Sequence, residues 1–249
     1  MGIPAGAGRL LGSGRTADVY TLDDHDGQGG LDDHDGLGDG PGGGAWVLRR
    51  YRDGYGDAPA EAAVMEYVRG HGYPVPRVRA ADARTDLVME RLYGPTVVEA
   101  VAAGRLTAGE AGSVLARLLR DLHAIPARRS TDPAVRVLHL DLHPENVLLT
   151  PAGPVVIDWS NTDEGPPGRD WSMSAVIVAQ VAVDDDPRAP LAEEMLSALL
   201  ADCPDPALLT GPDGGLGWAT GQRAVNPTMS PDEIELLGEA RQLIRRLLD

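Results

Sequence analysis

The chain has 249 residues, of which 43% are hydrophobic, so it can form one large domain or two smaller lobes and is not wholly disordered. Its net charge is −16, with 38 acidic residues against 22 basic ones, and this balance disfavours nucleic acid as a partner because phosphates would be repelled. The single cysteine, Cys203, excludes an internal disulfide and fits a reducing compartment. The sequence has neither a signal-peptide pattern nor a membrane-spanning apolar run, so we expect a cytoplasmic protein with no membrane partner.

The first third of the chain has the pattern of a β-rich lobe. Helical spacing predicts a helix over 59–71, and apolar runs bounded by turn residues predict strands within 9–22, 45–51, 78–81 and 86–90. Residues 23–44 interrupt this pattern with a segment, 23–31, that is nearly repeated at 32–40 and begins with Asp-Asp-His-Asp-Gly both times, a low-complexity composition that predicts a mobile loop. Metal binding by this repeat is the alternative, although its spacing matches neither the EF-hand nor the RTX calcium loop.

From residue 93 onward the pattern becomes helical. Thr107-x-x-Glu110 is a capping box, and the apolar residues that follow it lie on one stripe of a helix. Further helices are expected over 170–183, 190–201 and 230–248, the last of which begins with a second capping box. A β-rich lobe over 1–92 followed by a helical lobe over 93–249 predicts a two-lobed α+β protein.

Side chains able to support phosphoryl transfer gather in His139-x-Asp141-x-His143-x-x-Asn146, and Asp158 ends the apolar run that follows. A carboxylate such as that of Asp141 can accept the proton of an alcohol. The amide oxygen of Asn146 and the carboxylate of Asp158 are hard ligands that suit Mg²⁺. Transfer of a phosphoryl group from a nucleotide requires this combination, because its catalysis is mostly positioning and charge neutralisation.

This segment resembles the catalytic loop of the aminoglycoside phosphotransferase and choline kinase type of family, within the protein-kinase-like superfamily. The resemblance implies a protein-kinase-like two-lobed fold with a small β-rich N-lobe, a mainly helical C-lobe, and the nucleotide cleft between them. It also implies ATP or GTP and Mg²⁺ as cofactors. By this resemblance Asp141 is the catalytic residue, Asn146 and Asp158 are the metal ligands, and three residues support the loop: His139, His143 and Asp170.

The same resemblance assigns nucleotide binding to the first lobe. The turn within 9–22 has the pattern G-x-G-x-x-A-x-V, whose small residues let backbone N–H groups approach phosphates. The segment that ends at Leu92 is the expected hinge, where backbone groups would bind the adenine edge. The complete set of expected nucleotide contacts is Gly12, Ser13, Gly14, Val19, Val47, Arg49, Glu61, Met89, Glu90 and Leu92.

The strand over 45–51 departs from the family pattern, which has a lysine where this chain has Arg49. All 22 basic residues are arginines, so composition bias explains the change as well as lost activity does. If Val47 faces the adenine, strand alternation points Arg49 into the cleft and Arg50 away from it. The expected ion-pair partner of Arg49 is Glu61, and Glu66 is the alternative.

The acceptor is expected to be a small-molecule alcohol, and the acidity of the chain favours an aminoglycoside-like or other cationic one. Asp163 and Glu164, just beyond Asp158, are candidates for holding such a cation. The loops over 162–168 and 203–225, where acceptor specificity is expected, carry no readable motif. The alternative function is a nucleotide-binding pseudokinase that acts as a regulatory or scaffold module. The oligomeric state is left open.

Overall fold

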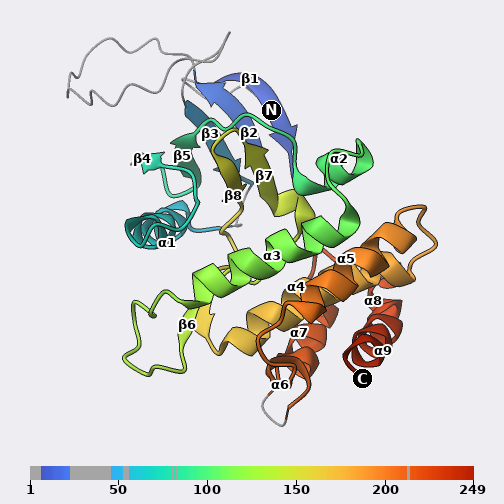
Figure 1. Ribbon diagram of the computed structural model, residues 1–249. Helices are drawn as coiled ribbons and strands as arrows, with labels where there is room; N and C mark the ends of the chain where they lie inside the picture. Colours follow the sequence, from blue (N-terminus) through green and yellow to red (C-terminus); the bar gives the residue numbers. More distant parts are fainter. Residues whose placement is uncertain (1–6, 23–45, 53–55, 80, 82, 212–213) are drawn as a thin grey trace, which may run out of the picture. The chain divides into compact units, whose positions relative to one another are not determined.

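The computed structural model describes residues 7–22, 46–52, 56–79, 81, 83–211 and 214–249 (Figure 1). The repeat within 23–44, predicted to be a mobile loop or a metal site, lies outside these residues. Two compact units make up the chain: unit 1 contains Met1–Arg69 and Pro76–Leu92, and unit 2 contains Gly70–Val75 and Tyr93–Asp249. The α+β class predicted from the sequence is confirmed, because unit 1 carries the main sheet and unit 2 most of the helices.

Unit 1 is built on a five-stranded antiparallel sheet with strand order β1-β2-β3-β5-β4. Its core is apolar: Leu48 and Leu87 are buried in adjacent strands, and helix α1 buries Met65 and Val68 at helical spacing. The elements are β1 (Ala7–Ser13), β2 (Ala17–Leu22), β3 (Trp46–Tyr51), α1 (Ala58–Gly70), β4 (Val78–Arg79) and β5 (Asp86–Glu90).

Unit 2 begins with two capped helices, α2 (Val97–Ala102) and α3 (Ala108–His123). The predicted capping box of α3 is present, with Thr107 and Glu110 each bonded to the other's backbone. Four leucines on one face of α3 are buried, as the predicted apolar stripe requires. They are Leu115, Leu118, Leu119 and Leu122.

The remaining helices of unit 2 gather around α4 (Pro167–Val183), whose sequence is buried over most of its length. Packed against it are α5 (Ala189–Ala201), α6 (Ala207–Thr210), α7 (Gly215–Ala224) and α9 (Leu237–Leu248) (Figure 1). None of the helices formed by the described residues is both long enough and apolar enough to cross a bilayer.

The final helix predicted over 230–248 is divided into α8 (Pro231–Glu235) and α9. The predicted capping box is present on α8, where Ser230 and Glu233 bond each other's backbone. The division falls at Leu236, which closes α8 and opens α9 while keeping right-handed helical angles. Hydrogen bonds run through it, from Leu236 N to Asp232 O and from Ala240 N to Leu236 O, so the interruption is one local turn.

Two small antiparallel ribbons frame the predicted catalytic segment. One pairs β6 (Arg136–Leu138) with β9 (Asp163–Gly165), and the other pairs β7 (Val147–Thr150) with β8 (Gly153–Val156). The loop after β6 and the 3₁₀ turn η1 (Pro144–Asn146) connect the two ribbons. Asp158 lies between β8 and β9, so both ribbons supply the residues that the sequence singled out.

Candidate active site

The loop that carries Asp141 has a strained backbone. Leu140 has φ +62°, a left-handed conformation that non-glycine residues rarely adopt. Asp170, in the first turn of α4, holds this backbone through two hydrogen bonds: it accepts from His139 N at 2.9 Å and from Leu140 N at 2.7 Å. The Asp170 carboxylate, at the N-terminus of α4, therefore holds the backbone that positions the side chain of Asp141.

Asp170 is fully buried and ionised. Burial alone would raise its pKa, but the hydrogen bond from His123, the charge of that histidine and the bonds from the backbone bring the pKa of Asp170 below its usual value. His123 Nε2 lies 3.0 Å from the carboxylate. Because the carboxylate keeps its charge, it can accept all three hydrogen bonds.

His139 supports the same loop from the other side. Its Nδ1 accepts from Asp141 N at 3.2 Å and its Nε2 lies 3.1 Å from Ile157 O, so the neutral Nε2–H tautomer satisfies both partners. The ring packs edge-on against Trp159, 4.8 Å between centroids. His143 caps η1, with Nδ1 accepting from Glu145 N at 3.4 Å. Both histidines thus occupy the environments expected of structural residues.

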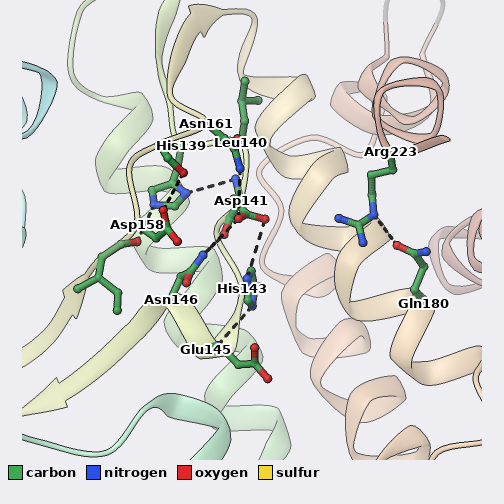
Figure 2. Close-up of polar contacts among 12 residues, drawn as sticks. His139, Leu140, Asp141, His143, Glu145, Asn146, Asp158, Asn161, Gln180 and Arg223 are labelled. Carbon is green, nitrogen blue, oxygen red and sulfur yellow. Dashed lines mark hydrogen bonds and ion pairs between the residues drawn. The ribbon is translucent and has the colours of Figure 1, made fainter. Parts of the chain in front are cut away.

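The carboxylate of Asp141 lies among amide and carboxylate groups (Figure 2). Asn146 Nδ2 donates to the backbone oxygen of Asp141 at 2.9 Å and lies 3.5 Å from its Oδ2, while Asn161 Nδ2 lies 3.3 Å from the same Oδ2. Asp158 has φ +61°, a second left-handed backbone, and its Oδ1 accepts from Ser160 Oγ at 2.7 Å. The side chains of Asp141, Asn146 and Asp158 are therefore brought together, as the sequence predicts.

The pKa of Asp141 is raised from 3.8 to about 7. Burial is the largest cause and the charge of Asp158 adds to it, while Arg223, Asn161 and Asn146 act in the opposite direction. A carboxyl group with a pKa near neutrality is suited to accept and release a proton at physiological pH.

Asn146 and Asp158 fit a divalent cation that is also held by a nucleotide. The Nδ2 of Asn146 is bound to Asp141, which orients its amide oxygen for a different partner. Among the described residues, no three His, Cys, Asp or Glu side chains form a metal site by themselves. Mg²⁺ is typically bound by one or two protein oxygens together with phosphates and water, and this pair matches that pattern.

In unit 1, Arg49 of β3 is buried and pairs with Glu61 of α1, 2.7 Å from Nη1 to Oε1. The hydroxyl of Tyr51 donates to the same carboxylate. The alternative partner, Glu66, lies instead 3.7 Å from Arg69 on the same helix. The pairing of Arg49 with Glu61 is thus the one that the structure contains.

Arg50, the neighbour of Arg49 in β3, pairs with Asp86 through Nε at 2.7 Å. Adjacent strand residues point to opposite faces of the sheet. Arg49 and Arg50 therefore have separate carboxylate partners, and only Arg49 points toward α1.

The remaining predicted nucleotide contacts lie on or beside four neighbouring strands of unit 1, β1, β2, β3 and β5. Gly12 and Ser13 end β1, Gly14 forms the turn with its N–H bonded to Ala17 O at 2.8 Å, and Val19 is on β2. Val47 of β3 is the register partner of Met89 on β5. Glu90 ends β5 and binds Arg77, and Leu92 ends unit 1.

A family model for the phosphotransferase enzyme family matches residues 11–135 and 126–209 of the chain. The chain belongs to the phosphotransferase enzyme family. A comparison with curated proteins gives no match.

Solved structures show the fold of this family member to be kinase-like. An amicoumacin kinase in complex with AMP-PNP and Ca²⁺ has 16% identity and a TM-score of 0.55, covering 98% of this chain and 89% of its own. An ethanolamine kinase from Plasmodium vivax has 11% identity and a TM-score of 0.59, covering 96% and 80%. A streptomycin–ATP–APH(2″)-IIa ternary complex has 12% identity and a TM-score of 0.51, covering 96% and 92%.

Two residues predicted to contact the acceptor of this phosphotransferase-family protein have structural partners instead. Glu164 accepts from the backbone N–H groups of Arg128 and Arg129 at 3.0 and 2.9 Å. Asp163 pairs with the Arg129 side chain at 2.6 Å. Both carboxylates belong to β9 and tie the 128–129 segment to it, so the structure gives no support to their binding a cationic acceptor.

Three residues of this family member were not predicted from the sequence: Asn161 and Arg223, which act on Asp141, and Gln180, which bonds Arg223. Asn161 follows Asp158 by three positions, so its nearness to the loop was a usable signal. The positive charge of Arg223, on α7, lowers the pKa of Asp141, and Arg223 Nε donates a hydrogen bond to Gln180 Oε1 on α4. Their positions depend on how α7 packs against α4, which no local sequence pattern reports.

Proposed function

We propose that the chain is an ATP-dependent O-phosphotransferase that acts on the hydroxyl group of a small molecule, with GTP as the alternative nucleotide. The observation that carries this proposal is the position of Asp141. Its carboxyl group has a pKa of about 7 and lies beside Asn146 and Asp158, whose side-chain oxygens we expect to hold one cation. The kinase-like neighbours that contain AMP-PNP or ATP support a nucleotide as phosphoryl donor.

In the proposed reaction, Asp141 orients the acceptor hydroxyl and takes its proton as the new O–P bond forms. The bond between the γ-phosphorus and the bridging oxygen of ATP breaks, and ADP leaves with the electron pair. Mg²⁺, held by Asn146 and Asp158, would supply charge neutralisation for the phosphates. Asn161 keeps the Asp141 carboxylate in one orientation through its contact with Oδ2.

Arg49 takes the place of the lysine on the phosphate-binding strand. Its pairing with Glu61 orients the guanidinium group, and Tyr51 fixes the same carboxylate. An arginine provides the positive charge and a bidentate fork for phosphate oxygens, although its geometry differs from that of lysine. We therefore expect Arg49 to contact the nucleotide phosphates.

The proposed chemistry of the acceptor is based on the charge of the chain. The net charge of −16 favours a cationic alcohol such as an aminoglycoside, because an acidic protein attracts cations from solution. Asp163 and Glu164, the residues expected to hold such a group, are engaged by Arg129. The cationic acceptor thus rests on net charge alone. The cytoplasmic location stays a prediction.

The test is ATP consumption by the purified protein with Mg²⁺ and a panel of alcohols, together with two variants. Asp141→Ala should lower turnover by about 10²–10⁴-fold, the usual range for loss of a general base. Asp186→Asn is the control, because Asp186 lies after α4 and bonds with Arg188. Turnover that is equal in Asp141→Ala and the wild type would contradict the proposed role.

The pseudokinase is the second candidate, and Arg49 in place of lysine is the observation that favours it. It predicts Mg²⁺-dependent nucleotide binding with no turnover on any alcohol, in the wild type and in Arg49→Lys alike. Turnover gained by Arg49→Lys alone would show that the arginine, and not the acceptor panel, limits the reaction.

A further inference from the structure

One residue at the end of β3 holds the turn between β1 and β2 of unit 1, residues 13–18. Arg52 directly follows β3, and its backbone N–H donates to Thr16 O at 2.9 Å, beside the pairing of β2 with β3. Its guanidinium group reaches further along the turn, where Nη1 donates to Arg15 O at 3.3 Å and Nη2 donates to Ser13 Oγ at 2.6 Å. The turn is therefore bound to the end of β3 both through the backbone and through a side chain.

Asp18, at the other end of the turn, binds the same guanidinium group. Its Oδ1 accepts from Arg52 Nη2 and from Ser13 Oγ, both at 2.6 Å, and its Oδ2 lies 3.4 Å from Arg52 Nε. The hydrogen bonds from Arg52 and Ser13 hold the pKa of Asp18 below its usual value, so the carboxylate is ionised at neutral pH. We call Ser13, Asp18 and Arg52 the turn clip, because the three side chains join the end of β1 to β2.

The turn clip and the predicted nucleotide contacts of β2 and β3 lie on opposite faces of the sheet. Register partners on neighbouring antiparallel strands share a face. Asp18 pairs with Arg50, and side chains alternate along a strand, so Arg52 lies on that same face. Val19 pairs with Arg49 on the other face, and both are predicted to contact the nucleotide. Arg52 thus binds the turn from the face that the nucleotide is not expected to occupy.

The composition of the turn explains why it needs to be held. Gly12 and Gly14 flank Ser13, and a Cβ added to Gly12 would meet nothing within 4 Å, so packing does not restrain the backbone there. Glycine loses more conformational entropy than any other residue when its backbone becomes fixed. A contact that fixes the turn before the nucleotide arrives reduces the entropy lost on binding, and this strengthens the binding.

We propose that Arg52 is a positioning residue for nucleotide binding, which together with Asp18 holds the 13–18 turn in the conformation that receives the phosphates of ATP. The inference rests on the nucleotide-binding part of the proposed function, since it takes this turn as the phosphate-binding element. The backbone N–H groups of such a turn contact phosphates. The contribution of Arg52 should therefore be confined to ligands that carry phosphates, because adenosine offers the turn nothing to bind.

The experiment measures the dissociation constants of ATP with Mg²⁺ and of adenosine by calorimetry on the purified full chain. Arg52→Gln should raise the Kd of ATP by about 3- to 10-fold, because several bonds to the turn are lost together. The Kd of adenosine should change by less than about 2-fold. This difference distinguishes a held turn from a general loss of structure, which would weaken the binding of both ligands.

A second variant distinguishes the turn clip from a simple effect of charge. Arg52→Gln removes a positive charge, which by itself would weaken the binding of the anionic nucleotide. Asp18→Ala removes a negative charge, so an effect of charge alone would tighten ATP binding, whereas loss of the turn clip should weaken it. The double variant should bind ATP no more weakly than Arg52→Gln, because both changes break the same contact.

Arg50→Gln is the matched control. Arg50 lies on the same face of β3 and has a similar side-chain exposure, 34% against 39% for Arg52, but it pairs with Asp86 instead of the turn. It removes the same charge and should change the Kd of ATP by less than about 2-fold, since solvent and salt screen exposed charges.

The outcomes separate the inference from the proposed function. If the wild type does not bind ATP, the proposed function fails and the inference fails with it. If the wild type binds ATP but Arg52→Gln leaves its Kd unchanged, or weakens ATP and adenosine equally, the inference alone is overturned. It is also overturned if Asp18→Ala tightens ATP binding, because Arg52 would then act through its charge and not through the turn.

Discussion

Replacement of Asp141 by Asn should stabilise the protein while it abolishes activity. A carboxyl group whose pKa is raised on folding destabilises the native state wherever it is ionised. The pKa of Asp141 rises from 3.8 to about 7, so this penalty is absent below pH 3.8, grows between pH 3.8 and 7, and is complete above pH 7. Asparagine has nearly the same shape and can still accept from Asn161, but it carries no charge.

The size of the effect follows from the pKa. A change from 3.8 to about 7 corresponds to about 4 kcal/mol above pH 7. Because 26% of the side chain remains exposed, solvent reduces this figure, and we expect about 2–4 kcal/mol. For a chain of this length, that corresponds to a rise in Tm of about 5–15 °C.

The assay is thermal or urea unfolding of the ligand-free protein between pH 5 and pH 9, without Mg²⁺. The stability gain of Asp141→Asn at pH 5 should be less than half of the gain above pH 7. Asp186→Asn is the matched control of opposite sign, since hydrogen bonds from Arg188 lower the pKa of Asp186 to about 2 and the substitution should therefore destabilise the protein. A gain for Asp141→Asn that does not change with pH would refute the reasoning, because charge could not be its cause.

Four further substitutions have expected outcomes. Glu61→Ala removes the carboxylate that pairs with the buried guanidinium group of Arg49 and should cost about 3–5 kcal/mol in urea unfolding. A loss below about 1 kcal/mol would show the pair to be incidental. Gly215→Ala should destabilise the protein by about 1–3 kcal/mol, because the added Cβ has no room against α4. Gly221→Ala on the same helix is the control: its Cβ meets nothing within 4 Å, so it should stabilise the protein by about 0.5–1 kcal/mol. Equal effects at the two positions would contradict the packing. Asp170→Asn can no longer satisfy every donor that now binds the carboxylate and should cost about 1–3 kcal/mol, together with faster hydrogen exchange at the two loop amides that it holds; unchanged exchange at those amides would show that the loop is held by other contacts.

Local patterns predicted much of this structure because local physics determines it. The capping box at Thr107 and Glu110 and the leucine stripe behind it are satisfied within one helix. Strand alternation was enough to assign different faces to Arg49 and Arg50, since a period of two depends only on backbone geometry. The local pattern did not predict the division at Leu236, where one turn separates α8 from α9 although the helical pattern is continuous.

The position of Arg223 near Asp141 could not be predicted from the sequence, for a physical reason. Arg223 reaches the vicinity of Asp141 because glycines at 168 and 215 allow two helices to approach closely, and this contact joins segments 47 residues apart. The sequence shows two glycines in a chain that has 31, so nothing marked this pair. Asp163 and Glu164 were candidates for holding a cationic acceptor because of their charge; the structure pairs them with the 128–129 segment, and their contact with an acceptor stays a prediction.

The proposed catalytic loop departs from the rules that favour folding. Leu140 and Asp158 both have left-handed backbones, and the carboxylates of Asp141 and Asp158 raise each other's energy. A sequence selected only for stability would remove each of these features, since glycine would relax the backbone and asparagine would remove a charge. The buried carboxylate of Asp170 instead holds the strained peptides in place by accepting hydrogen bonds from two of their N–H groups. A divalent cation between Asn146 and Asp158 would cancel the repulsion that Asp141 experiences, so the arrangement costs least when the proposed ligand is bound. Local instability maintained by surrounding order is the pattern expected of a binding and catalytic loop, so it supports the proposed site independently of the family to which the chain belongs.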